Sequence, residues 1–264
     1  MRPVQVTSRD GESGRHLPLD GNYNTRDLGG YATIDGRTTT WGKYFRSDTL
    51  AHLSPASRDT LIDYGVRSVV DLRRSAELQF EPSVFIGCEA VAYYHQNMSG
   101  DLALEGGEKL AEIEDPAEHR GRRYCLILEQ RKHILHQIMS ILAQKDGLPA
   151  IVHCRAGKDR AGIVAAFVLS ISGVPRDTIV ADYILTARYL IRRHLEQNPN
   201  VSPEEYTWKD FQDEACHPAT MELTLDYLDE RYGGVTGYLM DVGVTDDQLE
   251  AIRSAMTTES PGAA

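Results

Sequence analysis

The sequence predicts an α/β protein whose central, mostly parallel sheet is flanked by helices, and three observations support this. Residues 149–171 contain a short apolar run, a glycine-bearing loop and a long apolar run, the pattern of a strand, a loop and a buried helix. Residues 66–72 carry valine at three positions and end in charged side chains, as a buried strand does at its exit. Helix signals at 54–65 and 124–147 precede these strands, so helices are expected beside the sheet.

One domain is expected over residues 17–257. The chain has 264 residues, 41% of them hydrophobic, and no linker rich in proline, glycine or serine divides it. Residues 1–16 have few apolar side chains and predict a disordered arm, and residues 258–264 predict a frayed tail.

The sequence contains no apolar stretch long enough to cross a bilayer, and residues 1–14 lack the apolar core of a secretory signal. We therefore expect no integral membrane segment and, by default, a cytoplasmic protein. Export by a route that needs no such signal stays open.

Turn and cap signals place the N-terminal elements. The dipeptide Asp35-Gly36 predicts a hairpin with strands near 31–34 and 37–41. Ser54 and the following proline begin a helix that Gly65 ends. A further strand is expected at 89–94, which is rich in Val, Ala and Tyr.

Residues 100–121 are polar, acidic and interrupted by glycine, and they fit a surface loop and a helical lid over the site equally well. From Tyr124 an apolar stripe predicts one amphipathic helix that Gly147 closes. His133 and His136 lie on this helix without a third ligand nearby, so surface histidines are favoured over a metal site.

The C-terminal part is expected to be helical. An apolar helix at 160–172 is stopped by glycine and proline, and another helix spans 177–197. The basic end of this second helix complements the helix dipole, with a role in binding phosphate or lipid headgroups as the less favoured alternative. A capping box at Ser202 opens a helix to about Ala215, and two short helices follow, the last of them after a capping box at Thr245.

Charge and cysteine content exclude several classes of protein. The formal net charge of −11 argues against a nucleic-acid-binding surface. The four cysteines are far apart, so neither a zinc site nor a disulfide framework is indicated. Arg155, Lys158 and Arg160 nevertheless gather within six residues. A local positive pocket on an acidic body suits a compact anionic substrate.

The loop that begins at His153 reads H-C-R-A-G-K-D-R and has the features of an anion site. Backbone N–H groups in such a loop converge on one point, and the positive end of the following helix aims at the same point. Cys154 stands at the start of the loop, where this field favours its thiolate and makes it a nucleophile. Arg160 follows six residues later and can hold two phosphate oxygens at once.

This C-x5-R arrangement is the signature of the cysteine-dependent phosphatases. The strings HCRAGKDR, NTRDLGG and VVDLRR together resemble the bacterial tyrosine phosphatases of the mycobacterial PtpB and Listeria LipA type, in that family's order and over nearly the whole chain. The resemblance implies a cysteine-phosphatase-like fold. It also implies activity on phosphotyrosine and, in several members, on phosphoserine or phosphoinositides, without a metal or another cofactor. The expected partners are thus a phosphorylated protein, a phosphoinositide or a small phosphate ester.

The resemblance also implies roles for the loop residues. Cys154 would form a phosphocysteine intermediate, and Arg160 would clamp the phosphate. Asp159 would be the general acid, with Asp71 at a strand exit as its rival. The remaining phosphate ligands would be the amides of the loop, which includes Arg155, Ala156, Gly157 and Lys158.

Several residues would support the loop. His153 is expected to organise it by hydrogen bonding, and Asp71, if not the acid, would orient Arg73 or the loop. Arg26 and Asp27 match the family's N-terminal motif and are expected to pack beside the loop, although taken alone their glycine-rich stretch reads as a solvated turn.

One position departs from the pattern. Many cysteine phosphatases carry serine or threonine directly after the arginine, where Ala161 stands here. We expect hydrolysis of the intermediate to be slower than in relatives that have the hydroxyl. The alternatives that remain are a phosphatase of a small soluble metabolite, a phosphate-recognising binding module without turnover, and a sulfurtransferase.

Overall fold

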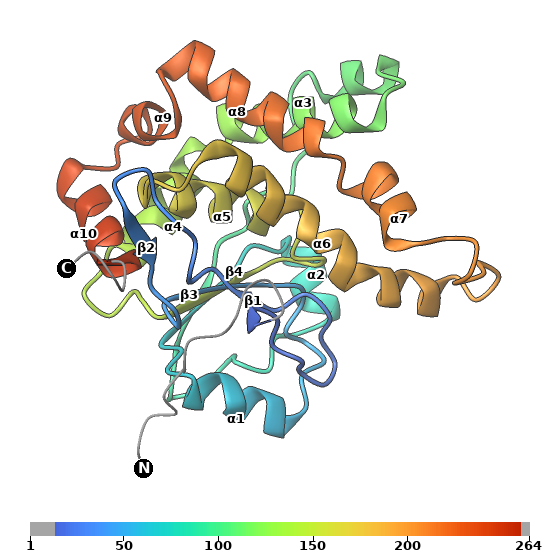
Figure 1. The fold of residues 1–264 in the computed structure, drawn as a ribbon, viewed down its shortest axis with the longest axis horizontal. Helices are drawn as coiled ribbons and strands as arrows, with labels where there is room; N and C mark the ends of the chain where they lie inside the picture. The colour runs from blue at the N-terminus through green and yellow to red at the C-terminus, as the bar shows by residue number, and fades with distance from the viewer. Residues whose placement is uncertain (1–13, 260–264) are drawn as a thin grey trace.

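The computed structural model describes residues 14–259 and confirms the predicted α/β architecture (Figure 1). Its main sheet has the strand order β1-β3-β6-β4-β5, in which β3, β6, β4 and β5 are parallel and β1 pairs antiparallel with β3. The strands are β1 Arg26–Asp27, β3 Tyr44–Ser47, β4 Ser68–Asp71, β5 Ala92–His95 and β6 Ala150–His153.

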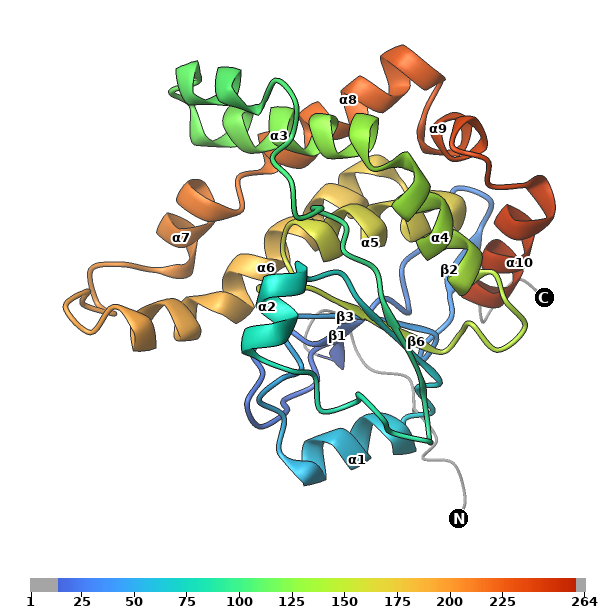
Figure 2. The same ribbon diagram turned by 180° about the vertical axis from the view of Figure 1, so that it is seen from behind.

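Helices cover both faces of this sheet. Helix α1 lies on one side and α4, α5 and α6 lie on the other, with α3, α8 and α9 in a further layer outside them (Figures 1 and 2). The helical elements are α1 Pro55–Asp63, α2 Ser75–Phe80, the 3-10 helix η2 Gly107–Glu112, α3 Pro116–Gln130, α4 Lys132–Leu142, α5 Arg160–Ile171, α6 Arg176–Gln197, α7 Trp208–Ala215, α8 Pro218–Tyr232, α9 Val235–Asp241 and α10 Asp246–Met256.

Neighbouring residues of the central strands supply two separate cores. Val70 and Val152 belong to the large core that contains α5, whereas Val69 and Ile151 belong to a smaller one with Leu61 of α1. Successive side chains of a strand point to opposite faces, so a strand buried on both sides is apolar without alternation. This explains the continuous apolar runs in the sequence.

The site is positioned by the register of the sheet and by one buried helix. Ser47 of β3 and Asp71 of β4 both align with His153 of β6, so these three parallel strands end level at one edge. Cys154 follows immediately. Ten of the 12 residues of α5 are buried, which fixes the N-terminal end of this helix against the same edge.

Several predicted elements are confirmed. Helix α1 has Ser54 as its N-cap, whose hydroxyl accepts from the amide of Ser57, and Gly65 beyond its end has φ +94°. Helix α10 begins with the capping box of Thr245 and Gln248. The strand expected at 89–94 is present as β5, shifted toward the C-terminus.

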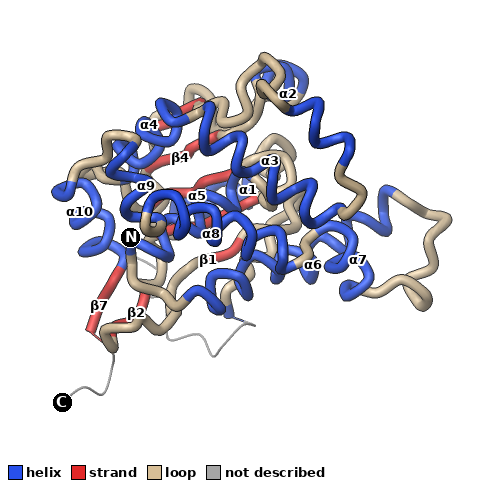
Figure 3. The backbone as a smooth tube through the Cα atoms, turned by 90° about the horizontal axis from the view of Figure 1, so that it is seen from above, coloured by secondary structure: helices blue, strands red, loops and turns tan. Residues whose placement is uncertain are grey.

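The hairpin and the tail differ from expectation. The turn at Asp35-Gly36 forms, but the strand after it, β2 Arg37–Thr39, pairs with β7 Thr257–Glu259 (Figure 3). The frayed tail predicted for 258–264 is therefore wrong at residues 258 and 259, and its remainder lies outside the described residues. The strand expected at 31–34 is reduced to one bridge between Ala32 and Thr38, and β7 pairs with the other edge of β2.

The N-terminal arm is shorter than expected. Arg15 is buried and donates to the carbonyl of Gly29, and His16 forms a bridge with Arg26. The predicted disordered arm 1–16 is thus wrong at its last residues, while 1–13 lie outside the described part. The sequence pattern also missed β1 and β3, because both residues of β1 are charged and two of the four residues of β3 are polar or charged.

The helix expected from Tyr124 to Gly147 is two helices, with a break at Arg131. At this break, the Arg131 side chain donates to the carbonyls of Ser99 and Leu102, which lie in the segment before α3. The capping box at Ser202 opens only a turn, and the next helix, α7, is capped instead by Thr207 and Asp210. Helix α9 was not predicted.

The segment 100–121 contains η2 and the start of α3. Glu105 and Gln130 exchange two hydrogen bonds, which tie the segment to the far end of α3. None of the described residues that line the cavity at Cys154 comes from it. Its role as a lid stays a prediction.

Candidate active site

The loop between β6 and α5 is held through its carbonyl groups. Three side chains and one backbone amide donate to these carbonyls from outside the loop. The contacts are Asn24 Nδ2 to Ala156 O at 2.9 Å, Arg46 Nη2 to Gly157 O at 2.7 Å and to Lys158 O at 3.2 Å, and both Arg193 Nη1 and Thr49 N to Arg155 O, at 3.1 and 3.2 Å. Because these carbonyls are bound on the outer side, the loop amides are left for an anion on the inner side.

Gly157 is required by the course of this loop. Its φ is +66°, a conformation that residues with a side chain rarely adopt. A Cβ atom there would also lie 2.6 Å from the carbonyl carbon and oxygen of Ser47. The loop can therefore pack against the end of β3 only with glycine at this position.

The guanidinium of Arg160 is paired with a carboxylate that the sequence did not reveal. Its Nη1 lies 2.6 Å from Glu77 Oε2, its Nη2 lies 3.1 Å from Oε1, and Nη1 also donates to the carbonyl of Leu72 at 3.2 Å. Burial raises the pKa of Glu77, but its hydrogen bonds with Arg160 outweigh this, so the pKa lies below its ordinary value. Glu77 thus orients the arginine as an ionised partner.

Asp159 lies at the other side of the loop, with its side chain 34% exposed. The hydroxyl of Tyr124 donates to Oδ1 at 2.6 Å, and the cations of Arg120 and Lys158 lie 3.7 and 3.8 Å from the same atom. Burial raises the pKa of Asp159, but Lys158, the Tyr124 hydrogen bond and Arg120 together hold it below its ordinary value. Without substrate, the carboxyl group is therefore ionised at neutral pH.

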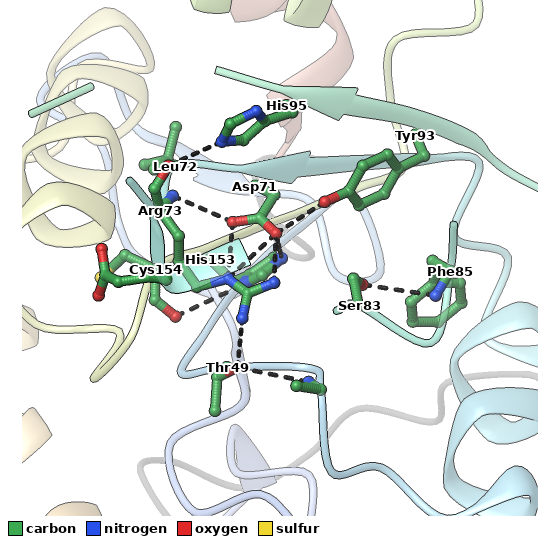
Figure 4. Close-up of polar contacts among 12 residues, drawn as sticks. Thr49, Asp71, Leu72, Arg73, Ser83, Phe85, Tyr93, His95, His153 and Cys154 are labelled. Atoms are coloured by element: carbon green, nitrogen blue, oxygen red, sulfur yellow. Dashed lines mark hydrogen bonds and ion pairs between the residues drawn. The ribbon is translucent and has the colours of Figure 1, made fainter. Parts of the chain in front are cut away.

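Asp71 is fully buried and has a different setting (Figure 4). It binds Arg73 through both oxygens, with Nη2 to Oδ2 at 2.7 Å and Nε to Oδ1 at 3.0 Å, and accepts from Tyr93 at 2.8 Å. Burial opposes ionisation of Asp71, but His153 and the bonds to Arg73 keep its pKa below the ordinary value. This carboxylate holds Arg73, which in turn donates to the carbonyl of Glu81.

His153 is buried beneath the loop. Its Nε2 lies 3.5 Å from Asp71 Oδ2 and its Nδ1 lies 3.4 Å from the carbonyl of Cys154. Burial lowers the pKa of His153 to about 4, against an opposing effect of Asp71. At neutral pH the ring is uncharged, so it contributes packing and weak polar contacts at the start of the loop.

A buried ionic cluster lies beside the loop and contains Arg26. Asp182 of α6 accepts from Arg26 Nε at 3.0 Å and from Arg46 Nη1 at 2.5 Å, and all three side chains are at most 1% exposed. Asp27 accepts from the amides of Gly29 and Gly42. The solvated turn expected from the glycine-rich stretch is therefore wrong. Arg46 links the cluster to the loop between β6 and α5, because it also donates to the carbonyls of Gly157 and Lys158.

A cavity of about 310 Å³ lies over the loop, bordered by α2, α3 and α5. Of the predicted site residues, it brings together five, namely Cys154, Arg155, Ala156, Asp159 and Arg160. Those not among its described lining residues are Gly157, Lys158, His153, Asp71, Arg73, Arg26 and Asp27. Its other described lining residues are Arg74, Glu77, Ser99, Arg123, Tyr124 and Ile127.

Comparison with known proteins identifies the family. The model of the tyrosine phosphatase family matches residues 17–258. This chain is a member of the tyrosine phosphatase family. It is 29% identical to the triple specificity protein phosphatase PtpB of Mycobacterium tuberculosis, over 92% of this chain and 98% of the relative. It is 28% identical to a tyrosine-protein phosphatase of Nostoc commune, over 80% of this chain and 72% of the relative.

As a member of this family, the chain is a phosphatase of the PtpB type, and its substrates are phosphorylated. Within residues 14–259, no helix is both long and apolar enough to span a membrane. In the same range, no group of His, Cys, Asp and Glu is arranged to hold a metal ion, and His133 and His136 are not part of one.

Sequence reasoning missed several residues that contact the loop between β6 and α5, among them Glu77, Tyr124, Arg193 and Arg46. Glu77 gave a weak local signal, since it stands at the third position of α2 and accepts from the amide of Arg74 as in a capping box. Tyr124 was recognised only as the start of an apolar stripe, and the contact with Asp159 spans 35 residues.

Proposed function

We propose that this phosphatase hydrolyses phosphomonoesters through a phosphocysteine intermediate at Cys154. The observation that supports it most is the gathering of Cys154, Asp159 and Arg160 in one cavity above a loop whose carbonyls are bound from outside. A nucleophile, an acid and an anion clamp are then available to a single phosphate group.

In the first step, the thiolate of Cys154 attacks phosphorus, and a sulfur–phosphorus bond forms as the bond to the leaving oxygen breaks. Negative charge spreads over the three equatorial oxygens, which the loop amides and Arg160 stabilise. Because Glu77 and the carbonyl of Leu72 already orient the guanidinium, little reorganisation is needed when phosphate enters.

Asp159 protonates the leaving oxygen in this proposal. Its depressed pKa is unfavourable for an acid, since its cationic neighbours favour the carboxylate. A phosphate dianion in the cavity would add a like charge near Asp159, which raises its pKa. Asp159 would therefore take up a proton when substrate binds, and it would pass this proton to the leaving oxygen.

In the second step, water attacks the phosphocysteine, and the sulfur–phosphorus bond breaks to give inorganic phosphate and the Cys154 thiolate. Asp159, now ionised, accepts the proton of the attacking water. Ala161 offers no hydroxyl to the departing sulfur, so this step is expected to limit turnover.

Asp71 is better suited to a positioning role. Its oxygens are occupied by Arg73 and Tyr93, it is fully buried, and it is not among the described residues that line the cavity. These contacts support Asp159 as the acid and Asp71 as the residue that holds Arg73 beneath the site.

Phosphotyrosine in proteins is the proposed substrate. Membership of the tyrosine phosphatase family supports it, and the printed name of the mycobacterial relative, a triple specificity phosphatase, supports a site that accepts more than one kind of phosphate ester. Phosphoserine and phosphoinositides are therefore included in the proposal. A small soluble metabolite remains the alternative substrate.

The test is hydrolysis of p-nitrophenyl phosphate in the presence of EDTA. We expect activity that vanadate blocks and that Cys154→Ser abolishes. Cys88→Ser is the matched control, because Cys88 is a partly buried thiol packed on the smaller core. Undiminished activity in Cys154→Ser would refute the mechanism, and binding of vanadate without any turnover would favour the binding-module alternative.

A further inference from the structure

A second cavity adjoins the catalytic one and has a one-sided charge. It has a volume of about 360 Å³ and shares Arg155 and Ala156 with the catalytic cavity. Its remaining described lining residues are Lys158, Leu190, Arg193, His194, Gln197 and Phe211. It therefore lies between the catalytic loop and the basic end of α6, with α7 on its outer side.

Three of the described lining residues are cations, a fourth is histidine, and none is acidic. This is unusual on a chain with a formal net charge of −11. The nearest carboxylates paired with these cations are Asp159, 3.8 Å from Lys158, and Asp48, 3.8 Å from Arg193. Both distances exceed that of a hydrogen bond, so the cations retain capacity for another anion.

The carboxylate nearest to Arg193 is already bound by other donors. Asp48 is 1% exposed and already accepts from the amides of Tyr23 and Asn24. Because Asp48 already binds these amides and its Oδ2 lies 3.8 Å from Arg193 Nη1, the guanidinium keeps donors for an anion that enters the cavity.

The basic groups are held in place before any ligand binds. The side chains of Lys158 and Arg193 are only 15% and 19% exposed, and Arg193 Nη1 donates to the carbonyl of Arg155 at 3.1 Å. His194 lies between aromatic rings, 5.2 Å from that of Tyr206 and 4.9 Å from that of Phe211. Cations fixed in this way lose little side-chain entropy on binding, which favours a specific site.

We propose that this cavity is a second anion subsite that recognises a carboxylate or phosphate on a residue close to the phosphotyrosine of a polypeptide substrate. The inference rests on the proposed function and names the substrates that this site prefers. In an extended peptide, side chains two residues apart point to the same side and are separated by about 7 Å. One such side chain can occupy the catalytic cavity while the other reaches the cavity beyond Arg155.

A polypeptide fits better than a membrane surface. The chain carries −11 net charge, which opposes approach to anionic lipid. The exposed large apolar side chains of the described residues, namely Ile34, Phe80, Ile86, Leu102 and Met240, are absent from the lining of this cavity. The cavity therefore lacks the apolar rim that inserts into a bilayer.

The experiment compares two phosphotyrosine peptides that differ only by glutamate or glutamine two residues from the phosphotyrosine. For the unaltered enzyme at low salt, we expect kcat/KM to be about tenfold higher for the glutamate peptide, and the preference to fall as salt is added. In Arg193→Gln the ratio should approach one. Use of a ratio removes any general effect of the substitution on the loop.

Arg192→Gln is the matched control, because Arg192 is the neighbouring arginine of α6 but is 80% exposed and pairs with Glu196. It should keep the ratio of the unaltered enzyme. A ratio near one in the unaltered enzyme, or a ratio unchanged in Arg193→Gln, overturns the subsite. A preference for multiply phosphorylated inositol lipids in vesicles without any preference among the peptides overturns the choice of a polypeptide. Absence of hydrolysis of both peptides and of p-nitrophenyl phosphate contradicts the proposed function itself.

Discussion

Replacing Asp159 and Asp71 separately by asparagine distinguishes the acid from the positioning residue, because the two carboxylates have different surroundings. Asp159 is partly exposed in the cavity and receives one hydrogen bond from Tyr124. Asp71 is fully buried and is bound through both oxygens to Arg73. Asparagine keeps the size of each side chain and removes its proton-transfer capacity and charge.

Asp159→Asn is expected to lower the reaction rate, whereas Asp71→Asn is expected to lower the stability of the fold. Loss of a general acid costs about two to four powers of ten in rate with a poor leaving group, or about 3–5 kcal/mol in transition-state stabilisation. With p-nitrophenol, which leaves without a proton, the loss at Asp159→Asn should be much smaller. Asp71→Asn leaves the buried Arg73 without its counter-charge, and breaking such a pair costs about 3–5 kcal/mol of stability. For a domain of this size, that lowers Tm by about 6–20 °C.

The assay measures kcat/KM for phenyl phosphate and p-nitrophenyl phosphate together with Tm for each variant. We expect Asp159→Asn to show a strong dependence on the leaving group with a nearly unchanged Tm, and Asp71→Asn to show the reverse. Equal losses on both substrates in Asp159→Asn would refute its role as the acid. A dependence on the leaving group in Asp71→Asn at a native Tm would assign that role to Asp71.

Three further outcomes are expected. Tyr124→Phe removes a hydrogen bond that helps to lower the pKa of Asp159. The descending limb of the pH profile of kcat/KM should therefore move to a pH about one unit higher. A limb that does not move would contradict this coupling. Ala161→Ser should raise turnover by restoring a donor to the departing sulfur; an unchanged kcat together with no burst of p-nitrophenol in the parent enzyme would exclude a slow second step. Burial raises the pKa of Asp48 to about 6 in the folded protein, so the folded state binds a proton there more tightly than the unfolded state does. Protonated Asp48 therefore contributes to the free energy of unfolding below pH 4, and this contribution is lost as the pH rises through 6. The unfolding free energy of the parent should therefore fall by about 3 kcal/mol more than that of Asp48→Asn between pH 4 and 7, as measured in guanidinium, and parallel pH dependences would show that the Asp48 pKa is ordinary.

Local patterns predicted those features that depend on neighbours in the chain. The strand, loop and helix around Cys154 were recognisable because the apolar runs on either side of the loop must be buried. The caps at Ser54 and Thr245 were recognisable because a cap satisfies amides within one turn. A pairing between segments far apart in the chain leaves no local signal, as β2 shows by pairing with β7.

The charged strands illustrate a second limit. β1 and β3 contain Arg26 and Arg46, which local polarity places in solvent. Both are buried because Asp182 of α6, more than 130 residues away, neutralises them. Burial of a charge depends on a partner that only the folded chain supplies, so no window of sequence around either arginine predicts it.

By itself, the sequence predicted the proposed nucleophile, the arginine six residues after it and the loop between them, because an anion site of this kind is built from consecutive amides and needs no distant residue. The tertiary structure alone decided which groups set the chemistry of that loop. Glu77 orients the guanidinium of Arg160. Tyr124 and Arg120 lower the pKa of Asp159, and Arg73 binds the carboxylate of Asp71 outside the cavity. The strength of an acid and the orientation of a clamp depend on charges within a few ångströms in space, and packing brings those charges from helices far apart in the chain.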